Sequence, residues 1–377
     1  MILPQIGAQG QARLAQSTAS IVGVGALGCA IADHLVRAGV GRIVLFDRDC
    51  VELSNLHRQV LFCEADAREG LPKAEAARRR LAAINSQTEL VAHVADLTPR
   101  NAEQLVMGGQ QEVPGAKRAA DEDVGALPDV LLDGTDNFQT RYLLNDLAVK
   151  YRVPFVYGGA VGTHGMQMTI VPGRTACLRC VFEQLPAPGT QPTCETAGVL
   201  GPVVSIVAAC QAADALRLLL GQGEEIAPTL LDFDIWQGRR HRLNLANAKR
   251  SACPCCGRHE YVFLDAENES EITPLCGQHA VQVWPRMPGA ARVGAQDGGS
   301  STHAWLDFQD LAARFEAAGM GDGLEVRPFM LRCRLKAEQT QDQKCMVLSI
   351  FRDGRAIIAG TTDPARARSV YAKYIGI

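Results

Sequence analysis

The chain has 377 residues, of which 47% are hydrophobic, and its formal net charge is −3. This length allows one large domain and a smaller one, and the near-neutral charge argues against a general nucleic-acid binder, which would carry a basic excess. No charged and apolar leader opens the sequence, and apolar runs such as 199–209 are broken by Gly, Pro or Ser and are too short to span a bilayer. We expect a soluble cytoplasmic protein that binds neither membranes nor nucleic acid directly.

The first elements along the chain predict a strand, a glycine turn and a helix. Residues 19–24 form a short β-branched run that is typical of a buried parallel strand, and Gly23, Gly25 and Gly28 follow at the spacing G-x-G-x-x-G. The first backbone N–H groups of a helix that begins there face outward and bind an anion. The motif therefore indicates a nucleotide phosphate site, although NAD and FAD enzymes share it.

A second predicted strand, over residues 42–46, ends in Asp47, where a carboxylate can accept both hydroxyls of a ribose. The segment Ser54-Asn55-Leu56-His57-Arg58-Gln59 then brings amide, hydroxyl and guanidinium groups close to the strand end. Such groups can bind a triphosphate. A site for a nicotinamide dinucleotide does not need them. The sequence therefore favours ATP, with an NAD-dependent oxidoreductase as the alternative. Within the segment, Ser54 can equally cap the local backbone, and His57 has no separate role assigned.

Further strands and helices continue the alternation, which is typical of an α/β fold with a mostly parallel sheet covered on both faces. Asp136 and Asn137 follow one of these strands at the carboxyl edge, where open α/β sheets bind ligands. We expect strands over 89–94, 130–132, 154–158 and 167–171, helices over 72–85, 138–151 and 203–220, and a surface loop over 108–127.

Several spaced motifs carry a family resemblance. Asp47, the segment 54–59, Pro72-Lys73 and Thr135-Asp136-Asn137 resemble the ATP-binding residues of the ThiF/MoeB/HesA family, bacterial relatives of ubiquitin-activating enzymes. The resemblance runs from about residue 3 to 257. It implies a Rossmann-like sheet with an antiparallel extension and an adenylyltransferase that acts, with ATP and Mg²⁺, on the C-terminal Gly-Gly carboxylate of a ubiquitin-like sulfur-carrier protein. Pyrophosphate leaves, and the adenylate serves sulfur transfer for thiamine, molybdopterin or a thiolated tRNA.

The resemblance also assigns roles to single residues. It implies that Arg58 and Lys73 hold the phosphates and that Asp136 lies near the metal and the α-phosphate, so we interpret these three as catalytic. Ala26 stands where many relatives have glycine, which a negative φ would tolerate. The full expected nucleotide-binding set is Gly23, Gly25, Ala26, Gly28, Asp47, Ser54, Asn55, Leu56, His57, Arg58, Gln59, Lys73, Asp136 and Asn137.

The resemblance implies partners as well. Family members usually open with an Arg-Tyr-x-Arg-Gln segment whose second arginine reaches the ATP of the opposite subunit in a homodimer. This sequence opens with Met1-Ile-Leu-Pro-Gln-Ile-Gly, just past that segment. Either the true start lies upstream, or the arginine is lacking and a catalytically impaired carrier-binding scaffold is the alternative. A separate sulfur donor, a cysteine desulfurase or sulfurtransferase, is a further implied partner.

The chain has 13 cysteines, and four of them form two CxxC pairs. Cys177 with Cys180, and Cys253 with Cys256, can each place two sulfurs on one ion, so together they predict a four-thiolate zinc site. Such a site leaves no position for water and is therefore structural. Buried free cysteines or a redox pair are the alternatives.

Other cysteines need separate interpretation. In the second cluster, Cys255 or His259 could substitute as a zinc ligand. Cys194 lies in a polar loop just before a predicted helix, whose N-terminus favours a thiolate. In relatives, a cysteine in this context takes the acyl group as a thioester or joins a sulfur relay as an acyl disulfide, so we interpret Cys194 as a nucleophile, with an exposed bystander as the alternative. The remaining thiols are expected in the core: Cys29, Cys50, Cys63, Cys210, Cys276, Cys333 and Cys345.

The last part of the sequence differs in character, and we expect an adenylation domain over 1–258 and a small α+β module over 259–377. Asp363 can cap the final helix, with proline at its first position. The module lacks the Cys-x-x-Gly-x-Arg loop of a rhodanese domain, so no built-in sulfurtransferase is expected, and carrier docking and simple packing are equally open roles. We expect strands over 346–350 and 355–359, joined by an Asp-Gly turn, and helices over 307–318 and 364–374.

Overall fold

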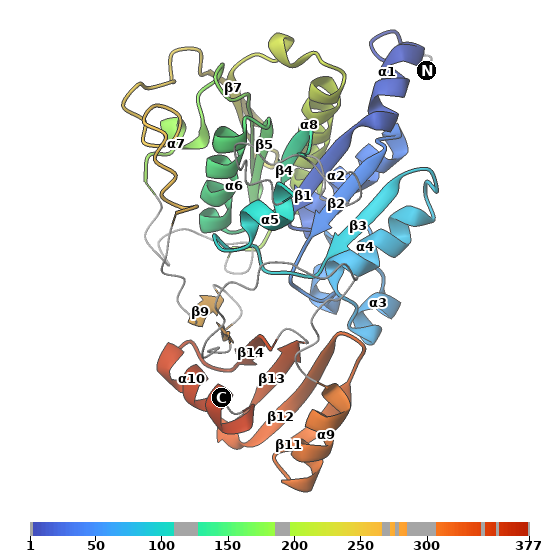
Figure 1. Cartoon of the computed structure of the whole chain (residues 1–377), viewed down its shortest axis with the longest axis vertical. Helices are drawn as coiled ribbons and strands as arrows, with labels where there is room; N and C mark the ends of the chain where they lie inside the picture. Colours follow the sequence, from blue (N-terminus) through green and yellow to red (C-terminus); the bar gives the residue numbers. More distant parts are fainter. Residues whose placement is uncertain are drawn as a thin grey trace, which may run out of the picture. The chain divides into compact units, whose positions relative to one another are not determined.

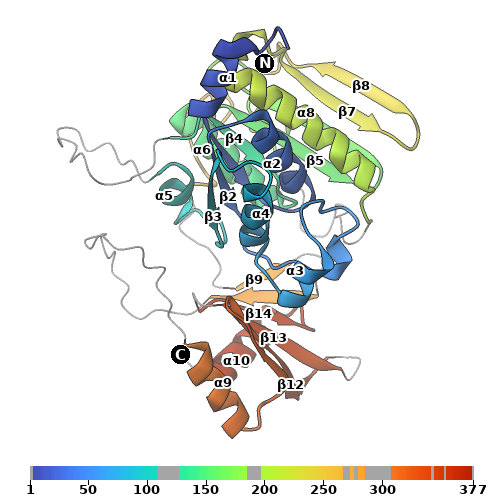
Figure 2. The ribbon, with the colours of Figure 1, turned by 90° about the vertical axis from the view of Figure 1, so that its right-hand side faces the viewer.

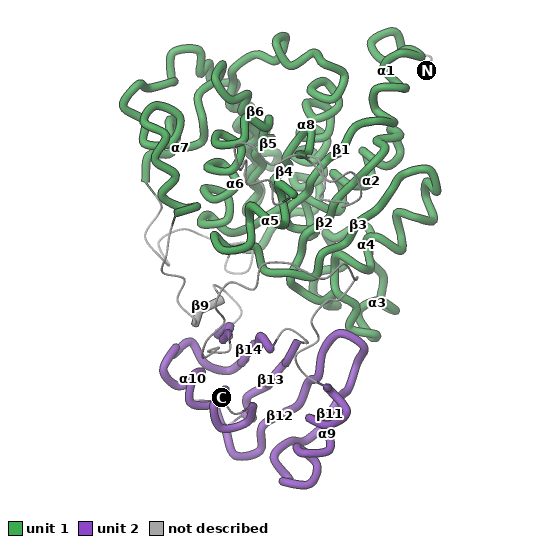
Figure 3. Tube along the Cα trace, in the orientation of Figure 1, with its two compact units in different colours: residues 1–267 green, residues 268–377 purple. Residues whose placement is uncertain are grey.

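The chain forms two compact units, residues 1–267 and 268–377 (Figure 3). The computed structural model describes residues 3–108, 127–184, 197–265, 272–275, 279–284, 307–340, 344–351 and 354–375. The first unit continues past residue 258, the boundary expected from the sequence, because the segment that follows still packs on it. The backbone N–H of Phe263 donates to Asp146 at 2.9 Å, and Leu264 is buried.

The first unit is built on an eight-stranded sheet with the order β3-β2-β1-β4-β5-β6-β7-β8. The first five of these strands along the chain run parallel, and the last three continue the sheet antiparallel. This confirms the predicted mostly parallel sheet with an antiparallel extension. The strands are β1 (Thr18–Val22), β2 (Arg42–Phe46), β3 (Glu89–His93), β4 (Val130–Asp133), β5 (Phe155–Val161), β6 (His164–Ile170), β7 (Thr229–Asp234) and β8 (Arg239–Asn244).

Helices cover both faces of this sheet (Figures 1 and 2). α2, α4 and α8 pack on one face, and α5 and α6 lie on the other. α8 is long and apolar enough to cross a membrane by length and composition, yet it packs against α2 and against β4, β5 and β6 as a core helix. The helices are α1 (Gly7–Gln16), α2 (Ala26–Ala38), α3 (Glu64–Glu69), α4 (Lys73–Ala82), α5 (Ala102–Val106), α6 (Phe138–Tyr151), α7 (Leu178–Val181) and α8 (Gly201–Leu219), with 3-10 turns η1 (Leu53–Asn55) and η2 (Gly223–Glu225).

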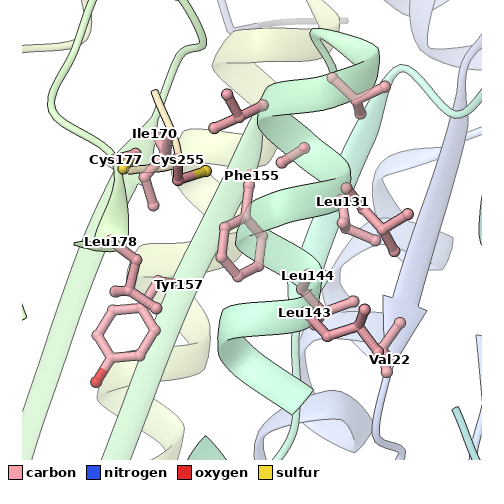
Figure 4. Packing of buried hydrophobic residues seen from close by; sticks show 14 of the residues in the cluster. Val22, Leu131, Leu143, Leu144, Phe155, Tyr157, Ile170, Cys177, Leu178 and Cys255 are labelled. Atoms are coloured by element: carbon pink, nitrogen blue, oxygen red, sulfur yellow. The ribbon is translucent and has the colours of Figure 1, made fainter. Parts of the chain in front are cut away.

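The parallel strands are apolar because both of their faces are covered. Val22 and Leu131 lie in one buried cluster with Leu144 of α6 and Phe155 of β5, which Figure 4 shows from close by. Ile21, on the opposite face of β1, is fully buried as well. The resulting rigid sheet fixes the loops at its carboxyl edge, where the candidate site lies.

The second unit is a six-stranded antiparallel sheet with two helices. Its strand order is β11-β12-β13-β14-β10-β9, and the predicted hairpin is confirmed by the antiparallel pairing of β13 with β14. Asp363 caps the final helix by accepting the backbone N–H of Ala365 at 2.9 Å, as expected. The elements are β9 (Ile272–Leu275), β10 (Ala280–Val283), α9 (Phe308–Ala317), β11 (Gly321–Val326), β12 (Met330–Gln339), β13 (Cys345–Phe351), β14 (Ala356–Ala359) and α10 (Pro364–Tyr374).

Candidate functional site

The glycine turn between β1 and α2 is packed against the turn that follows β4. Gly23 has φ +84°, and a Cβ added there would lie 2.7 Å from the backbone of Gly134. A Cβ on Gly28 would lie 1.9 Å from the carbonyl oxygen of Gly23, so neither position tolerates a side chain. Gly25 is the N-cap of α2 and makes no side-chain cap, which leaves the first N–H groups of α2 available to an anion. Ala26 begins the helix itself.

Asp47 is fixed at the end of β2 by backbone donors. One carboxylate oxygen accepts the N–H of Val24 at 2.7 Å, and the other accepts the N–H of Asp49 at 2.8 Å. Each oxygen of an ionised carboxylate has a second lone pair, so both can still accept a ribose hydroxyl. The geometry therefore suits the role that the sequence predicts for this residue.

The segment 54–59 is held together by its own side chains. The Nδ2 of Asn55 donates to Ser54 Oγ at 2.9 Å, and Gln59 Nε2 donates to Asn55 Oδ1 at 3.0 Å. Gln59 is 3% exposed, and its Oε1 has no hydrogen-bond partner in the part of the chain that the structure describes. An unpaired buried acceptor costs roughly 1–3 kcal/mol. The same side-chain amide lies beside Gly25, where an added Cβ would be 3.8 Å from Gln59 Nε2. The unpaired Oε1 suits a ligand that brings a hydrogen-bond donor.

Arg58 and its neighbours in this segment are less firmly held. Arg58 Nη1 lies 3.4 Å from the Ser54 carbonyl oxygen and 3.4 Å from His57 Nε2, which are long contacts for a guanidinium. Arg58 and Leu56 are half-buried, whereas Ser54 and His57 are exposed. The loosely held guanidinium can therefore turn to a phosphate without breaking a strong interaction.

Lys73 begins α4 and is paired with Asp49. Its side chain is 9% exposed, and its Nζ lies 2.9 Å from Asp49 Oδ2. Burial opposes the charged form, but Asp49 and Asp47 raise the pKa of Lys73 well above its ordinary value. Arg48 next to this pair makes two contacts with Asp96, at 2.9 and 3.0 Å. A cationic ammonium is thus held at the sheet edge.

The turn after β4 brings a third loop to this edge. Asp136 is exposed. It lies close enough to Lys73 and Arg48 for its negative charge to raise the pKa of both side chains. Asn137 caps α6 by accepting the N–H of Gln139 at 2.8 Å. Its amide N–H₂ is therefore the part of Asn137 that remains for a nucleotide.

Sequence reasoning missed two residues that shape this turn. Buried Asp133 accepts hydrogen bonds from the N–H and hydroxyl of Thr135, at 2.9 and 2.7 Å, and from Arg141 Nε at 3.1 Å. Arg141 Nη2 also donates to the Thr135 carbonyl at 2.6 Å. The signal in the sequence is Arg141 itself, which lies in the first turns of the helix that follows the segment Asp133–Asn137. An arginine at that position can reach back to the carboxylate at the strand end.

The expected metal-ligating cysteines come together as predicted. The sulfurs of Cys177, Cys180, Cys253 and Cys256 all lie within 4.8 Å of one another, and three separations are 3.9, 3.6 and 3.4 Å. A tetrahedral zinc site with a zinc–sulfur distance of about 2.3 Å has sulfur–sulfur edges of about 3.8 Å. Four largely buried thiolates are the donor set that zinc prefers, so the cluster fits the predicted closed site.

The alternative ligands of the second cluster have other partners. Cys255 is buried in the core near Cys177 (Figure 4). Its sulfur accepts a hydrogen bond from Asn145 Nδ2 at 3.2 Å. The ring of His259 contacts the Tyr261 hydroxyl at 3.2 Å. Asn145 also accepts the N–H of Leu178 at 2.8 Å, so α6 braces both cysteine pairs.

The other cysteines fall into three groups. Cys194 and Cys276 lie outside the described residues. Cys29 and Cys333 are buried as expected, and Cys50 and Cys210 are half-buried. The core prediction is wrong for Cys63 and Cys345, which are exposed: Cys63 precedes the short helix α3, and Cys345 begins β13.

Comparison with known proteins decides the family. A model of the ThiF family matches residues 1–255. The chain belongs to the ThiF family. This ThiF-family protein is 41% identical over 371 residues to the "Sulfur carrier protein ThiS adenylyltransferase" of Bacillus subtilis (strain 168). The match covers 98% of this chain and 96% of that one.

Two further relatives agree with this result, and a solved structure shows the same fold. The "Sulfur carrier protein adenylyltransferase" of Thermus thermophilus is 37% identical over 262 residues, covering 68% of this chain and 88% of that one. The "Adenylyltransferase and sulfurtransferase MOCS3" of Drosophila ananassae is 37% identical and covers 74% of this chain, which spans 56% of the MOCS3 length. Among solved structures, E. coli MccB in complex with MccA-N7isoASN has TM-score 0.53 and 23% identity, covering 66% of this chain and 69% of that chain, and shows the shared fold.

Proposed function

We propose that this ThiF-family protein uses ATP to adenylate the C-terminal carboxylate of a small sulfur-carrier protein. The observation that carries the proposal is the 41% identity, across 98% of this chain, to a protein named for that activity. The polar groups at the carboxyl edge of the sheet support it, because they combine a ribose acceptor, an open helix N-terminus and two cationic side chains. A nicotinamide dinucleotide has no triphosphate for these two cations to neutralise.

In the proposed reaction, a carrier carboxylate oxygen attacks the α-phosphorus of ATP, and the bond to the β-phosphate breaks to release pyrophosphate. The turn of Gly23 to Gly28 receives phosphate oxygens, and Asp47 accepts the ribose hydroxyls. Arg58 and Lys73 offset the negative charge that develops on the triphosphate, and Asn55 and Gln59 orient the nucleotide. Asp136 would hold Mg²⁺, which supplies further charge neutralisation when it is bound.

We also propose that Cys177, Cys180, Cys253 and Cys256 hold a structural Zn²⁺. The four sulfurs come from two segments that are far apart in sequence, so an ion there joins them within one unit. Since all four ligands are protein thiolates, the ion has no open position for substrate. Its contribution is stability of the first unit.

The partners follow from the same proposal. The carrier ends in Gly-Gly and has a ubiquitin-like fold, the enzyme is a cytoplasmic homodimer, and a separate cysteine desulfurase or sulfurtransferase donates the sulfur. The B. subtilis relative is named for the carrier ThiS, which makes a thiamine carrier the first to test, ahead of molybdopterin and tRNA thiolation carriers. Carrier docking and simple packing are the two roles that we propose for the second unit.

The deciding experiment is ATP–pyrophosphate exchange with each small Gly-Gly protein of the same genome. We expect exchange that depends on one such carrier and disappears when its last glycine is deleted. Exchange with none of them would contradict the proposal. Carrier binding without exchange would instead identify a catalytically impaired scaffold, and nicotinamide binding would favour an oxidoreductase.

A second experiment tests the proposed nucleophile. Cys194→Ala should leave carrier-dependent exchange unchanged but impair delivery of sulfur to the carrier, because a thioester or acyl disulfide forms only after adenylation. Cys345→Ala is the matched control, since it removes an exposed thiol of the second unit and should change neither step. Unimpaired sulfur delivery by Cys194→Ala would show that the assignment is wrong.

A further inference from the structure

Lys73 is held by one residue at two points. Its Nζ lies 2.9 Å from Asp49 Oδ2, and its backbone N–H donates to the Asp49 carbonyl oxygen at 2.8 Å. The Lys73 side chain is 9% exposed and that of Asp49 is 31% exposed. The backbone contact fixes the start of α4 whatever side chain residue 49 carries. The carboxylate can therefore be replaced without loss of that contact, and its effect can be measured separately.

The groups around Lys73 favour the ammonium form. Burial alone would lower the pKa of this lysine, but Asp49 and then Asp47 raise it above its ordinary value. Asp49 is the group that hydrogen-bonds directly to the ammonium. The carboxylates that act on Lys73 are Asp47 and Asp49 after β2 and Asp136 after β4. The thiol of Cys29 on α2, whose own pKa is raised by burial, and the Arg48 guanidinium, whose Nε lies 3.7 Å from Asp49 Oδ1, complete the surrounding groups.

We propose that Asp49 is a positioning residue that keeps the Lys73 ammonium charged and directed at the nucleotide phosphates. An ammonium has three N–H donors, and within the described residues Asp49 accepts one of them, so two remain for phosphate oxygens. The inference rests on the proposed use of ATP and deepens it, because it gives a role to a carboxylate that does not itself need to touch the nucleotide. Without this carboxylate, burial acts on Lys73 with less opposition and favours the neutral amine.

Other roles for Asp49 give different results when the carboxylate is removed. A carboxylate that only repels the triphosphate would, once removed, leave ATP bound more tightly at every pH. A carboxylate that binds Mg²⁺ directly would, once removed, weaken ATP binding in a way that excess Mg²⁺ restores. A positioning carboxylate predicts a new loss of affinity at alkaline pH, as Lys73 loses its proton.

The test is ATP affinity of the full chain, measured by calorimetry with Mg²⁺ at pH 8, 9 and 10. We expect less than about a twofold change for the unmodified protein. Asp49→Asn should lose affinity by up to about tenfold for each pH unit above the lowered pKa of Lys73. In the double variant Asp49→Asn with Lys73→Arg, this loss should disappear, because a guanidinium stays protonated.

Asp96→Asn is the matched control. It removes a carboxylate that contacts Arg48 at 2.9 Å in the same region, whereas the Lys73 ammonium donates to Asp49, so its pH profile should follow that of the unmodified protein. An Asp49→Asn profile parallel to the unmodified protein, tighter binding at every pH, or restoration by excess Mg²⁺ would each overturn the inference.

A nucleotide-independent measurement separates this inference from the proposed function. Of the two forms of a lysine side chain, acetic anhydride modifies only the neutral amine. Acetylation of Lys73, measured by mass spectrometry as a function of pH, therefore shows the pH at which its ammonium loses the proton. We expect this pH to be lower in Asp49→Asn than in the unmodified protein, and equal profiles would contradict the inference. If the unmodified protein binds no ATP, the proposed function fails, while the acetylation profiles still decide whether Asp49 keeps Lys73 charged.

Discussion

The cysteine cluster and the polar site at the sheet edge lie in the same unit but are built in opposite ways. Three of the four clustered cysteines are buried and their sulfurs face one another, whereas Asp136 is exposed and Arg58 is half-buried. The polar site is braced from behind, by Asp133 under the β4 turn and by Asp49 next to Lys73. Under the proposed function, the inward-facing thiols stabilise the first unit, and the side chains on the braced sheet edge bind the nucleotide.

The largest effect should come from breaking the closed cluster. Cys177→Ser replaces a buried thiol of the proposed zinc site, and loss of a structural metal is among the few single changes that cost about 4 kcal/mol or more. We expect loss of bound zinc, measured as zinc per chain by mass spectrometry, and a large fall in the unfolding temperature. A variant that keeps zinc and stability would show that the cluster is a set of free thiols.

Cys255→Ser is the control for this experiment. Its sulfur is fully buried but is bonded to Asn145 and is not one of the four clustered thiols. We expect unchanged zinc content and a stability loss of about 1–2 kcal/mol from the altered hydrogen bond and packing. Loss of zinc in this variant would instead make Cys255 a ligand.

At the polar site on the sheet edge, which is the open site of this comparison, we expect a substitution to change activity and not stability. Arg58→Ala removes a cation that makes only 3.4 Å contacts within the described chain, so unfolding should change by less than about 0.5 kcal/mol. Carrier-dependent ATP–pyrophosphate exchange should fall by about 100-fold or more, as for loss of one transition-state donor. Arg79→Ala is the control, because Arg79 is 51% exposed and pairs with Glu75 on the outer surface of α4. Equal loss in both variants would refute a specific role for Arg58.

The same contrast explains what could be predicted from the sequence. The strands from β1 to β5 and the helix α6 were predictable because their apolar residues recur at the period of a buried strand or of a helix. The glycines from Gly23 to Gly28 fixed the turn that follows β1. The clustering of Cys177, Cys180, Cys253 and Cys256 was predictable because CxxC spacing is a local constraint. The family match confirms the resemblance that these motifs carried.

What the sequence did not predict depends on contacts between distant segments. The ion pair of Lys73 with Asp49 joins residues 24 apart, and the pairing of Asp133 with Arg141 is visible only once the β4 turn is folded. The residue that donates a hydrogen bond to the Cys255 sulfur is Asn145, which is 110 residues away. Local patterns identify ligands of one type, whereas the groups that brace them are set by tertiary packing.

The smallest expected effect concerns surface charge beside the open site. Glu75, in the first turn of α4, lies 2.7 Å from Arg78 and 2.8 Å from Arg79, and these hydrogen bonds, that of Arg78 foremost, lower its pKa. A carboxylate with a lowered folded-state pKa stabilises the protein above its unfolded value of about 4.3, and this contribution is lost as the pH falls through the folded value.

Glu75→Gln should therefore reduce the free energy of unfolding by about 0.5 kcal/mol at pH 7, the size expected for a solvent-screened pair. Urea denaturation at pH 7, 5 and 3.5 should show this difference shrinking as the medium becomes more acidic, because the glutamate of the unmodified protein is then protonated too. A difference that is independent of pH would mean that packing, and not charge, stabilises this turn. A loss of more than about 2 kcal/mol in the free energy of unfolding would remove the contrast between the two sites. The polar site would then depend on its surface charges for folding, as we expect the cysteine cluster to depend on its thiolates.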